Sequence, residues 1–374
     1  MNKYKSLLII VLMLTITHES WSQKKDVAIG AKENKKSDGD EPKEDLVETG
    51  NAWLDSALVV MQGEDKKYAK RLFKYAIKDY SKALELKNTS FTLYYNLAIA
   101  QTQLKKYEDA VENFSKAIEQ DSSSANAYRE RAMAYKGLKK FDLVVSNLDT
   151  AIDLNYDDAA AFYQRAIIRE TGRAYQPPLD DYNRAIELEP EFEEAYFKRG
   201  VLYHNKVQDF VRAKLDMEKV LQLNTENAEA YFWLGKINFS AGDFSTSNQF
   251  LTQHLEFDSL RVDALLMRGA SRTNLKMYTD AIEDFTLVIE LDKKNVFAYM
   301  NRGLAKGGLR LFDEALLDLD KAAELKFDFS SIYVNRALIK FHIGDRDGAC
   351  KDLKKAQSLN NTKADELLDE YCLF

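Results

Sequence analysis

The sequence predicts an all-α fold of stacked antiparallel helix pairs. Three observations lead to this prediction: a sequence repeat of fixed period, helical spacing of the apolar residues within each repeat, and a scarcity of helix-breaking residues. Among 374 residues only 15 are glycine and 4 are proline, which is few for a protein with many hairpin turns. Such a chain favours helices joined by short turns.

The repeat is visible in segments such as AYFKRGVLYHN at residue 195 and AYMNRGLAKGG at residue 298. It recurs about every 34 residues, and only one repeat is longer, by one residue near Asn205–Val207. We name each repeat by its first residue; the repeats start at residues 91, 125, 159, 193, 228, 262, 296 and 330. A fixed period of this size indicates stacked supersecondary units.

Each repeat carries the pattern of two helices. Position 4 is bulky, position 8 is small, position 17 is mostly aromatic and position 20 is mostly small. Positions 4, 8 and 11 share one face of a first helix, and positions 17, 20, 24 and 27 share one face of a second. A turn near position 14 or 15 then brings small residues against each other, so that the two backbones approach closely. One pair cannot bury these faces alone, so neighbouring pairs must stack.

This pattern resembles the tetratricopeptide repeat, W-x2-L-G-x2-Y followed by A-x3-F and P. Tyrosine mostly replaces the Trp, arginine mostly replaces the Leu, and the closing proline survives only as Pro190. The resemblance covers residues 91–363 and implies a right-handed α-solenoid of eight repeats. Residues 50–90 are predicted to be a degenerate first helical repeat, and residues 364–374 a C-terminal capping helix.

The N-terminus has the features of an export signal. Lys3 and Lys5 precede an apolar run from Leu7 to Ile16, which is too short to span a bilayer. We expect residues 1–22 to be a signal peptide cleaved before Gln23; an uncleaved interfacial helix is the alternative. Residues 23–49 are rich in charge and are predicted to be a disordered linker. The mature chain is therefore expected to lack a membrane span and to be periplasmic or secreted.

A recurrent charge pair accounts for the arginine at position 7. Arg302 and Asp318 lie equally far from the turn at position 15, so in an antiparallel pair they sit at the same height. We predict that they pair between the two helices; independent solvated charges are the alternative. The same pairing is predicted for four further repeats, as Arg165–Asp181, Arg199–Asp216, Arg268–Asp284 and Arg336–Asp352. Repeat 228 has the apolar residues Leu234 and Phe250 instead.

The two cysteines are predicted to form a disulfide. Cys350 and Cys372 are equally far from residue 361, in the turn before the capping helix. Disulfides persist in the compartments that exported proteins reach. Two reduced, buried thiols are the alternative.

No catalytic chemistry is predicted. The sequence has no phosphate-binding glycine loop, nucleophile elbow or metal-ligand spacing, so we expect no catalytic residue, metal or cofactor. The net charge of -7 does not suit a nucleic-acid partner. His254 replaces a usually small residue at position 27 and is expected to pack or to hydrogen-bond.

The resemblance instead implies a groove lined by the first helices. Positions 2, 5, 9 and 12 commonly point into it, but position 5 is never lysine, so the charged clamp of some relatives is absent. The candidate partner-binding residues are Tyr95, Tyr163, Phe197, Phe232, Trp233, Phe239 and Met300. Repeat 228 carries three of them, which makes it a candidate centre for binding or a looser joint.

We therefore predict an exported, non-enzymatic scaffold that binds a protein or peptide in an aromatic groove. The alternative is a glycan-binding or carrier subunit of a polysaccharide-handling system, in which the aromatic rings stack on sugars. The sequence also leaves open a homodimer through the degenerate first repeat.

Overall fold

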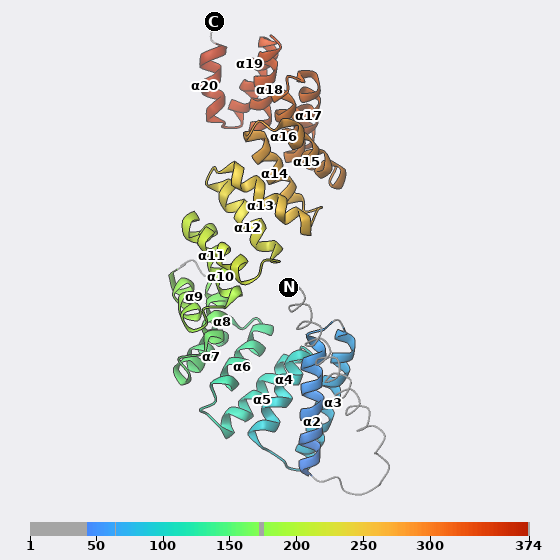
Figure 1. Ribbon diagram of the computed structural model, residues 1–374, viewed down its shortest axis with the longest axis vertical. Helices are drawn as coiled ribbons and strands as arrows, with labels where there is room; N and C mark the ends of the chain where they lie inside the picture. Colours follow the sequence, from blue (N-terminus) through green and yellow to red (C-terminus); the bar gives the residue numbers. More distant parts are fainter. Residues whose placement is uncertain (1–42, 64, 172–175, 373–374) are drawn as a thin grey trace, which may run out of the picture. The chain divides into compact units, whose positions relative to one another are not determined.

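The computed structural model describes residues 43–63, 65–171 and 176–372. Within these ranges every regular element is a helix, and consecutive helices form antiparallel pairs, as the sequence predicts (Figure 1). The described residues therefore form an all-α repeat solenoid. The predicted signal peptide and most of the predicted linker lie outside them.

The chain divides into two compact units, Met1–Leu188 and Glu189–Phe374. In the first unit, coloured blue to green in Figure 1, four helix pairs follow one another. The helices are α2 (Lys43–Met61), α3 (Lys66–Glu85), α4 (Phe91–Gln103), α5 (Tyr107–Gln120), α6 (Ala125–Gly137), α7 (Phe141–Leu154), α8 (Ala159–Arg169) and α9 (Gln176–Leu188).

The second unit holds five helix pairs and a closing helix, with a short π-helical turn, η1, at the end of the first helix. Its elements are α10 (Glu193–Leu202), η1 (Tyr203–Val207), α11 (Phe210–Leu223), α12 (Ala228–Ser240), α13 (Phe244–Phe257), α14 (Val262–Asn274), α15 (Tyr278–Leu291), α16 (Val296–Gly308), α17 (Phe312–Leu325), α18 (Ser330–His342), α19 (Arg346–Ser358) and α20 (Thr362–Tyr371).

The boundaries of the outer segments differ from the predicted ones. Residues 43–49, assigned to the linker, belong to α2, where Leu46 is only 1% exposed. The charged residues around Leu46 made this turn look like linker, but a charged helix is stable once its apolar residues pack on a neighbour. At the other end, α20 begins at Thr362 rather than at residue 364.

Small residues let the two helices of a pair approach each other. A Cβ added to Gly303 of α16 would lie 3.1 Å from the carbonyl oxygen of Ala315 and 3.0 Å from Leu319 Cγ on α17. At Gly235 of α12 the added atom would lie 2.5 Å from Leu251 Cγ. Position 8 therefore faces position 24 and the backbone of position 20, which explains why it is always Ala or Gly.

The predicted Arg–Asp pairs are present in all five repeats, and we call them the Arg–Asp ladder. Arg302 donates through Nη2 to one carboxylate oxygen of Asp318 at 2.7 Å and through Nε to the other at 2.9 Å. Asp318 is almost buried, with a side chain 7% exposed. The other four pairs have the same two-bond geometry. The ladder thus fixes how these five hairpins close.

The structure adds two features that the pairing argument did not contain. The third nitrogen of the arginine reaches the second helix of the preceding repeat; Arg302 Nη1, for example, donates to Thr286 Oγ1 at 3.1 Å. Equivalent bonds join Arg165 to Asp149 and Arg336 to Asp320.

In four repeats a second cation, one helical turn after the arginine, also contacts the aspartate; these cations are Arg169, Arg272, Lys306 and Lys340. The ladder therefore links neighbouring repeats as well as the two helices of one repeat.

Repeat 228 interrupts the ladder. Leu234 is fully buried in place of the arginine and Phe250 takes the place of the aspartate. Leu234 has no polar group that could reach α11, so the contact between repeats 193 and 228 lacks the arginine bridge.

The turn between the two helices of a repeat imposes a left-handed backbone. Lys276 has φ 63° and Arg310 has φ 61°, whereas Gly242 and Gly344 occupy the equivalent position in other repeats. A left-handed residue with a Cβ is strained by about 1–2 kcal/mol, and glycine is not.

We expect Lys276→Gly to raise the free energy of unfolding by about 0.5–1 kcal/mol, because relief of strain exceeds the entropy that glycine loses on folding. Urea unfolding of the variant and the wild type measures the change. Asn274→Gly, inside α14 where the backbone is helical, is the control and should give no gain. If both variants are destabilised equally, the turn is not strained.

Cys350 of α19 and Cys372, just after α20, form a disulfide in the structure, with their Cα atoms 5.9 Å apart. Helix α20 also packs Ala364, Leu367 and Leu368 against the core of the last repeat. The closing helix is thus held by a covalent bond and by apolar burial.

Candidate functional site

The seven residues predicted to bind a partner all lie on first helices of repeats. Tyr95 (α4) and Tyr163 (α8) belong to the first unit, and the other five belong to the second, on α10, α12 and α16. In the first unit the two tyrosines are half-buried by neighbouring rings. Tyr95 lies 5.5 Å from Phe91 and 5.8 Å from Phe114, and burial raises its pKa. Tyr163 lies 5.9 Å from Tyr182.

Phe232 is the one of the seven that does not belong to a binding surface. It is only 4% exposed and is part of the core around Leu265. The guanidinium of Arg261, the last residue of repeat 228, covers its ring at 3.7 Å. We therefore correct the prediction: Phe232 packs between repeats and offers no surface to a partner.

His254 lies beside Phe232, with the ring centroids 5.4 Å apart, and is 1% exposed. Its Nδ1 lies 2.8 Å from the carbonyl oxygen of Ala228, so this nitrogen carries the proton and donates it. Its Nε2 has no hydrogen-bond partner in the described part of the chain. The residue packs and hydrogen-bonds as predicted, at the cost of one unsatisfied buried acceptor.

We expect His254→Val to raise the free energy of unfolding by about 1 kcal/mol. An unsatisfied buried polar atom costs about 1–3 kcal/mol, whereas the lost bond to Ala228 contributes about 1 kcal/mol. Valine fits because Val220 and Val288 hold this position in neighbouring repeats. Urea unfolding measures the change, and His254→Ala, which leaves a cavity, is the control. A loss of stability in His254→Val would mean that the bond to Ala228 outweighs the orphaned nitrogen.

The extra residue of repeat 193 has a structural consequence that the sequence did not reveal. It produces the π-helical turn η1, which is followed by Gln208 with φ 59°. π-helical turns are often found at functional sites. The turn carries His204, whose ring lies 5.4 Å from Phe210 and 5.5 Å from Trp233 of the next repeat. His204 is therefore the residue that joins the faces of α10 and α12.

Hydrogen bonds hold His204 in place. Its Nδ1 lies 2.9 Å from Asn205 Oδ1, and its Nε2 lies 3.2 Å from Ser240 Oγ on α12. Burial lowers the pKa of His204, and the nearby charge of Lys236 lowers it further, although the bond to Asn205 acts in the opposite direction. The imidazole is thus neutral near pH 7.

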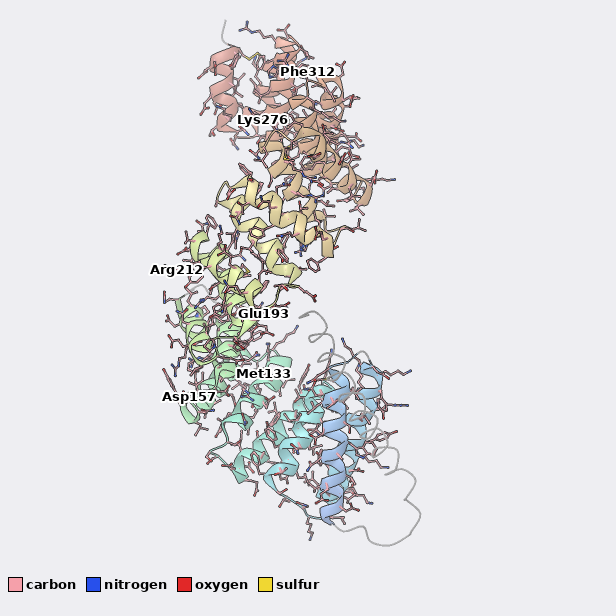
Figure 2. The ribbon with its side chains drawn as sticks, viewed as in Figure 1. Met133, Asp157, Glu193, Arg212, Lys276 and Phe312 are labelled. Carbon is pink, nitrogen blue, oxygen red and sulfur yellow. A yellow bond between two sulfur atoms is a disulfide. The ribbon has the colours of Figure 1, made fainter. Side chains whose placement is uncertain are left out.

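Lys236 completes this cluster. Its ammonium lies 4.5 Å from the centre of the Trp233 ring, a cation–π contact. We call the surface formed by His204, Trp233, Lys236 and Ser240 the His204 patch. Ser240 is exposed and the other three side chains are half-buried. A partner can therefore reach the patch, and neighbouring residues restrict the movement of its side chains. Figure 2 draws the side chains of this region and labels Glu193, at the start of α10, and Arg212 on α11.

The remaining predicted residues flank this patch or lie further along the unit. Phe197 is half-buried on α10, two turns before His204. Phe239 adjoins Ser240 and packs edge-on against Phe244 at 5.5 Å. Met300, on α16, packs partly against the core around Leu319. Trp233 and Phe239 thus share helix α12 but pack against different rings, and Met300 lies on another helix.

Acidic residues are absent from the two sequence stretches that form the patch. Asp and Glu make up 60 of the 374 residues, yet neither occurs from Ala195 to Gln208 or from Ala230 to Gly242. In the first unit, Arg129 of α6 forms an ion pair with Asp158 at 2.5 Å. Other first helices, among them α16 and α18, also contain no Asp or Glu, so this feature is shared along the array.

The described residues contain no cluster of three or more side chains suited to a metal ion. In the same part of the chain, no helix is both long and apolar enough to cross a bilayer.

Comparison with known proteins agrees with this architecture. Residues 92–124 and 330–363 match tetratricopeptide repeat families, so the chain contains tetratricopeptide repeats. The predicted family resemblance is confirmed for these two segments. No curated protein matches the sequence significantly.

Several solved structures are similar to parts of this chain. The tetratricopeptide-repeat protein YrrB, described as having an unusual peptide-binding site, is 24% identical over 53% of this chain and 97% of its own, with a TM-score of 0.47. Cut9, from the APC/C hetero-tetramer Cut9–Hcn1, gives 17% identity over 86% of this chain and 63% of that chain, with a TM-score of 0.48. The pilF protein of Pseudomonas aeruginosa gives 16% identity, 57% and 93% coverage, and a TM-score of 0.47. These similarities concern the fold.

Proposed function

We propose that this protein is an exported, non-enzymatic scaffold that binds a protein or peptide partner on the first-helix face of its second unit. Tetratricopeptide repeats are protein-interaction modules, which supports the general class. The observation that carries the location is the His204 patch, where Trp233 remains accessible beside an unpaired amine and an exposed hydroxyl. Accessible aromatic side chains dominate the energetics of protein interfaces.

Two features support export. The N-terminal 22 residues have the pattern of a signal peptide, and the chain forms a disulfide, a bond that persists in oxidising compartments. The mass of the protein isolated from its native cells tests this proposal: we expect a chain that starts at Gln23. A chain that retains residue 1 would contradict cleavage.

Affinity capture from native envelope extract tests the binding proposal. The bait is the chain from Gln23, compared with a Trp233→Ala/Phe239→Ala variant that keeps the wild-type circular dichroism spectrum. We expect a partner that the wild type enriches and the double variant loses. Leu317→Ala, at a side chain 69% exposed on α17, is the matched control and should capture the same partner.

Equal capture by the wild type and the double variant would contradict this location. The glycan alternative is tested on the same proteins, because neutral oligosaccharides would quench Trp233 fluorescence if the ring stacks on sugars. A peptide site predicts no such quenching.

A further inference from the structure

Helix α3, the second helix of the degenerate first repeat, presents a basic face to solvent. It carries seven Lys or Arg residues and only two acidic residues, Asp79 and Glu85. All seven basic side chains, from Lys66 to Lys82, are exposed. At about 100° per residue they project within about 160° of the helix circumference, on the side opposite the buried residues of α3. The buried side holds α3 on α2 and α4, and the basic face points away from both (Figure 1).

The acidic residues nearby do not neutralise this face. Asp79 is turned toward α2, where its carboxylate accepts a hydrogen bond from Trp53 Nε1 at 3.1 Å. Asp45, Glu48 and Asp55 of α2 are exposed, but within the described residues they form no ion pair with α3. Five lysines of the basic face likewise form no ion pair in the described part of the chain: Lys66, Lys67, Lys70, Lys74 and Lys78.

The basic charge of α3 distinguishes it from the other second helices. Six of these helices carry more acidic than basic residues; they are α5, α7, α9, α13, α15 and α17. The next most basic, α19, has four basic residues against two acidic ones. Since the whole chain has a net charge of -7, α3 is a local exception. A confined basic face on an acidic protein indicates an anionic ligand for that face.

Exposed apolar side chains adjoin the basic face and indicate what kind of anion it binds. Val59 and Met61 are exposed at the end of α2, just before the turn that leads into α3. Tyr75, also exposed, lies on α3 at the edge of the basic face. A bilayer surface suits both features, because its headgroup phosphates attract cations and its interface takes up apolar and tyrosine side chains. A nucleic acid or a charged polysaccharide offers no hydrocarbon, so the combination favours lipid.

We propose that the basic face of α3, together with Val59 and Met61, binds the surface of an anionic lipid bilayer. The face extends about 24 Å along the helix from Lys66 to Lys82, which is long enough to contact several headgroups at once. Helix α3 stays packed on α2 and α4 when it binds, so the contact is peripheral and reversible. The inference concerns a different surface from the proposed partner site and does not depend on it.

Co-flotation with lipid vesicles tests the inference. The protein is the chain from Gln23, which retains every described residue and lacks the apolar N-terminal run that would itself bind lipid. The vesicles contain phosphatidylcholine alone, or equal parts of phosphatidylcholine and phosphatidylglycerol. We expect binding only to the vesicles with phosphatidylglycerol, and release from them as the ionic strength is raised.

Lys70→Gln/Lys74→Gln/Lys78→Gln removes three charges from the middle of the basic face. Glutamine and lysine have similar helix propensities, so α3 should stay folded. Each basic residue near an anionic surface strengthens binding roughly fivefold, and the triple variant should therefore bind about a hundredfold more weakly.

The matched control is Lys293→Gln/Lys294→Gln/Lys351→Gln, which removes the same charge from exposed lysines of the second unit. This variant should bind the vesicles like the wild type. Val59→Ser/Met61→Ser tests the apolar contact. It should weaken vesicle binding several-fold and leave retention on heparin, a soluble polyanion, unchanged.

Four results would overturn the inference. Failure to bind the phosphatidylglycerol vesicles would reject the bilayer, and retention on heparin in that case would assign the face to a soluble polyanion. Equal binding to neutral and anionic vesicles would show that the lysines do not recognise charge. An equal loss in the two triple variants would mean that net charge, rather than α3, governs binding. Full binding by Val59→Ser/Met61→Ser would remove the argument for lipid over other polyanions. The capture experiment, which concerns the second unit, is decided separately from all four.

Discussion

Asp318→Ala is expected to lower the free energy of unfolding by about 3 kcal/mol, the largest loss from any single change in the Arg–Asp ladder. The carboxylate is 7% exposed and accepts from Arg302, while Lys306 contacts it at 2.9 Å. Without it, two half-buried cations face each other with no anion between them. Removing one partner of a buried pair typically costs about 3–5 kcal/mol, and the value here is at the low end because Arg302 is 17% exposed.

The chain itself supplies the control for this prediction. Repeat 228 closes its own hairpin with Leu234 and Phe250 at the positions of the arginine and the aspartate. Asn238 stands at the position of Lys306. The variant Arg302→Leu/Lys306→Asn/Asp318→Phe transfers this set into repeat 296. We expect the triple variant to recover most of the stability that Asp318→Ala loses, because a buried pair can be replaced by apolar residues at little cost.

Repeat arrays unfold by segments, so a global midpoint can miss a local change. Amide hydrogen exchange in α16 and α17 is therefore the better measurement, with urea unfolding beside it. A double-mutant cycle of Arg302→Ala and Asp318→Ala gives the interaction free energy between the two side chains. If the two losses simply add, the pair does not act as a unit, and the ladder is a set of independent charges.

The ladder also shows how far the sequence predicts this fold. Equal distance from a turn is enough to pair Arg302 with Asp318, because an antiparallel hairpin has one register. The hydrogen bond from Arg302 to Thr286 depends on the angle at which successive hairpins stack. The spacing of residues within one repeat does not determine that angle. The second cation was within reach of sequence reasoning, since Lys306 lies four residues after Arg302 and so on the same helix face.

The candidate site was less predictable, for a similar reason. Phe232 and Trp233 are adjacent aromatic residues and both were predicted to bind a partner, but Phe232 packs into the core around Leu265 of the following repeat. Burial at such a position is decided by the neighbouring repeat. His204 was missed altogether, because its contact with Trp233 arises from the π-helical turn. The only sign of it in the sequence was the extra residue of repeat 193. An extra residue predicts that the backbone departs from the regular repeat, but it does not predict a π-helical turn.

Removing the disulfide is the second change with a large expected effect. Cys350→Ser/Cys372→Ser should destabilise the C-terminal end of the second unit by about 3 kcal/mol, since the bond closes a loop across a sequence separation of 22 residues. Helix α20 is short, and an isolated helix of ten residues is not stable in water. Without the bond, only the apolar contacts of Leu367, Leu368 and Ala364 and the hydrogen bonds of Arg346 to the Tyr371 carbonyl hold it.

The loss should be confined to the end of the array, because each repeat contacts only its neighbours. Amides of α19 and α20 are expected to exchange faster in the double serine variant, and those of α12 and α13 to stay unchanged. Wild-type protein treated with a reductant should behave like the variant, which separates loss of the bond from any effect of the serine hydroxyls. Unchanged protection of α20 in both samples would show that apolar packing alone holds the closing helix. Acceleration throughout the second unit would instead mean that the cap stabilises the whole stack, so that its repeats unfold together.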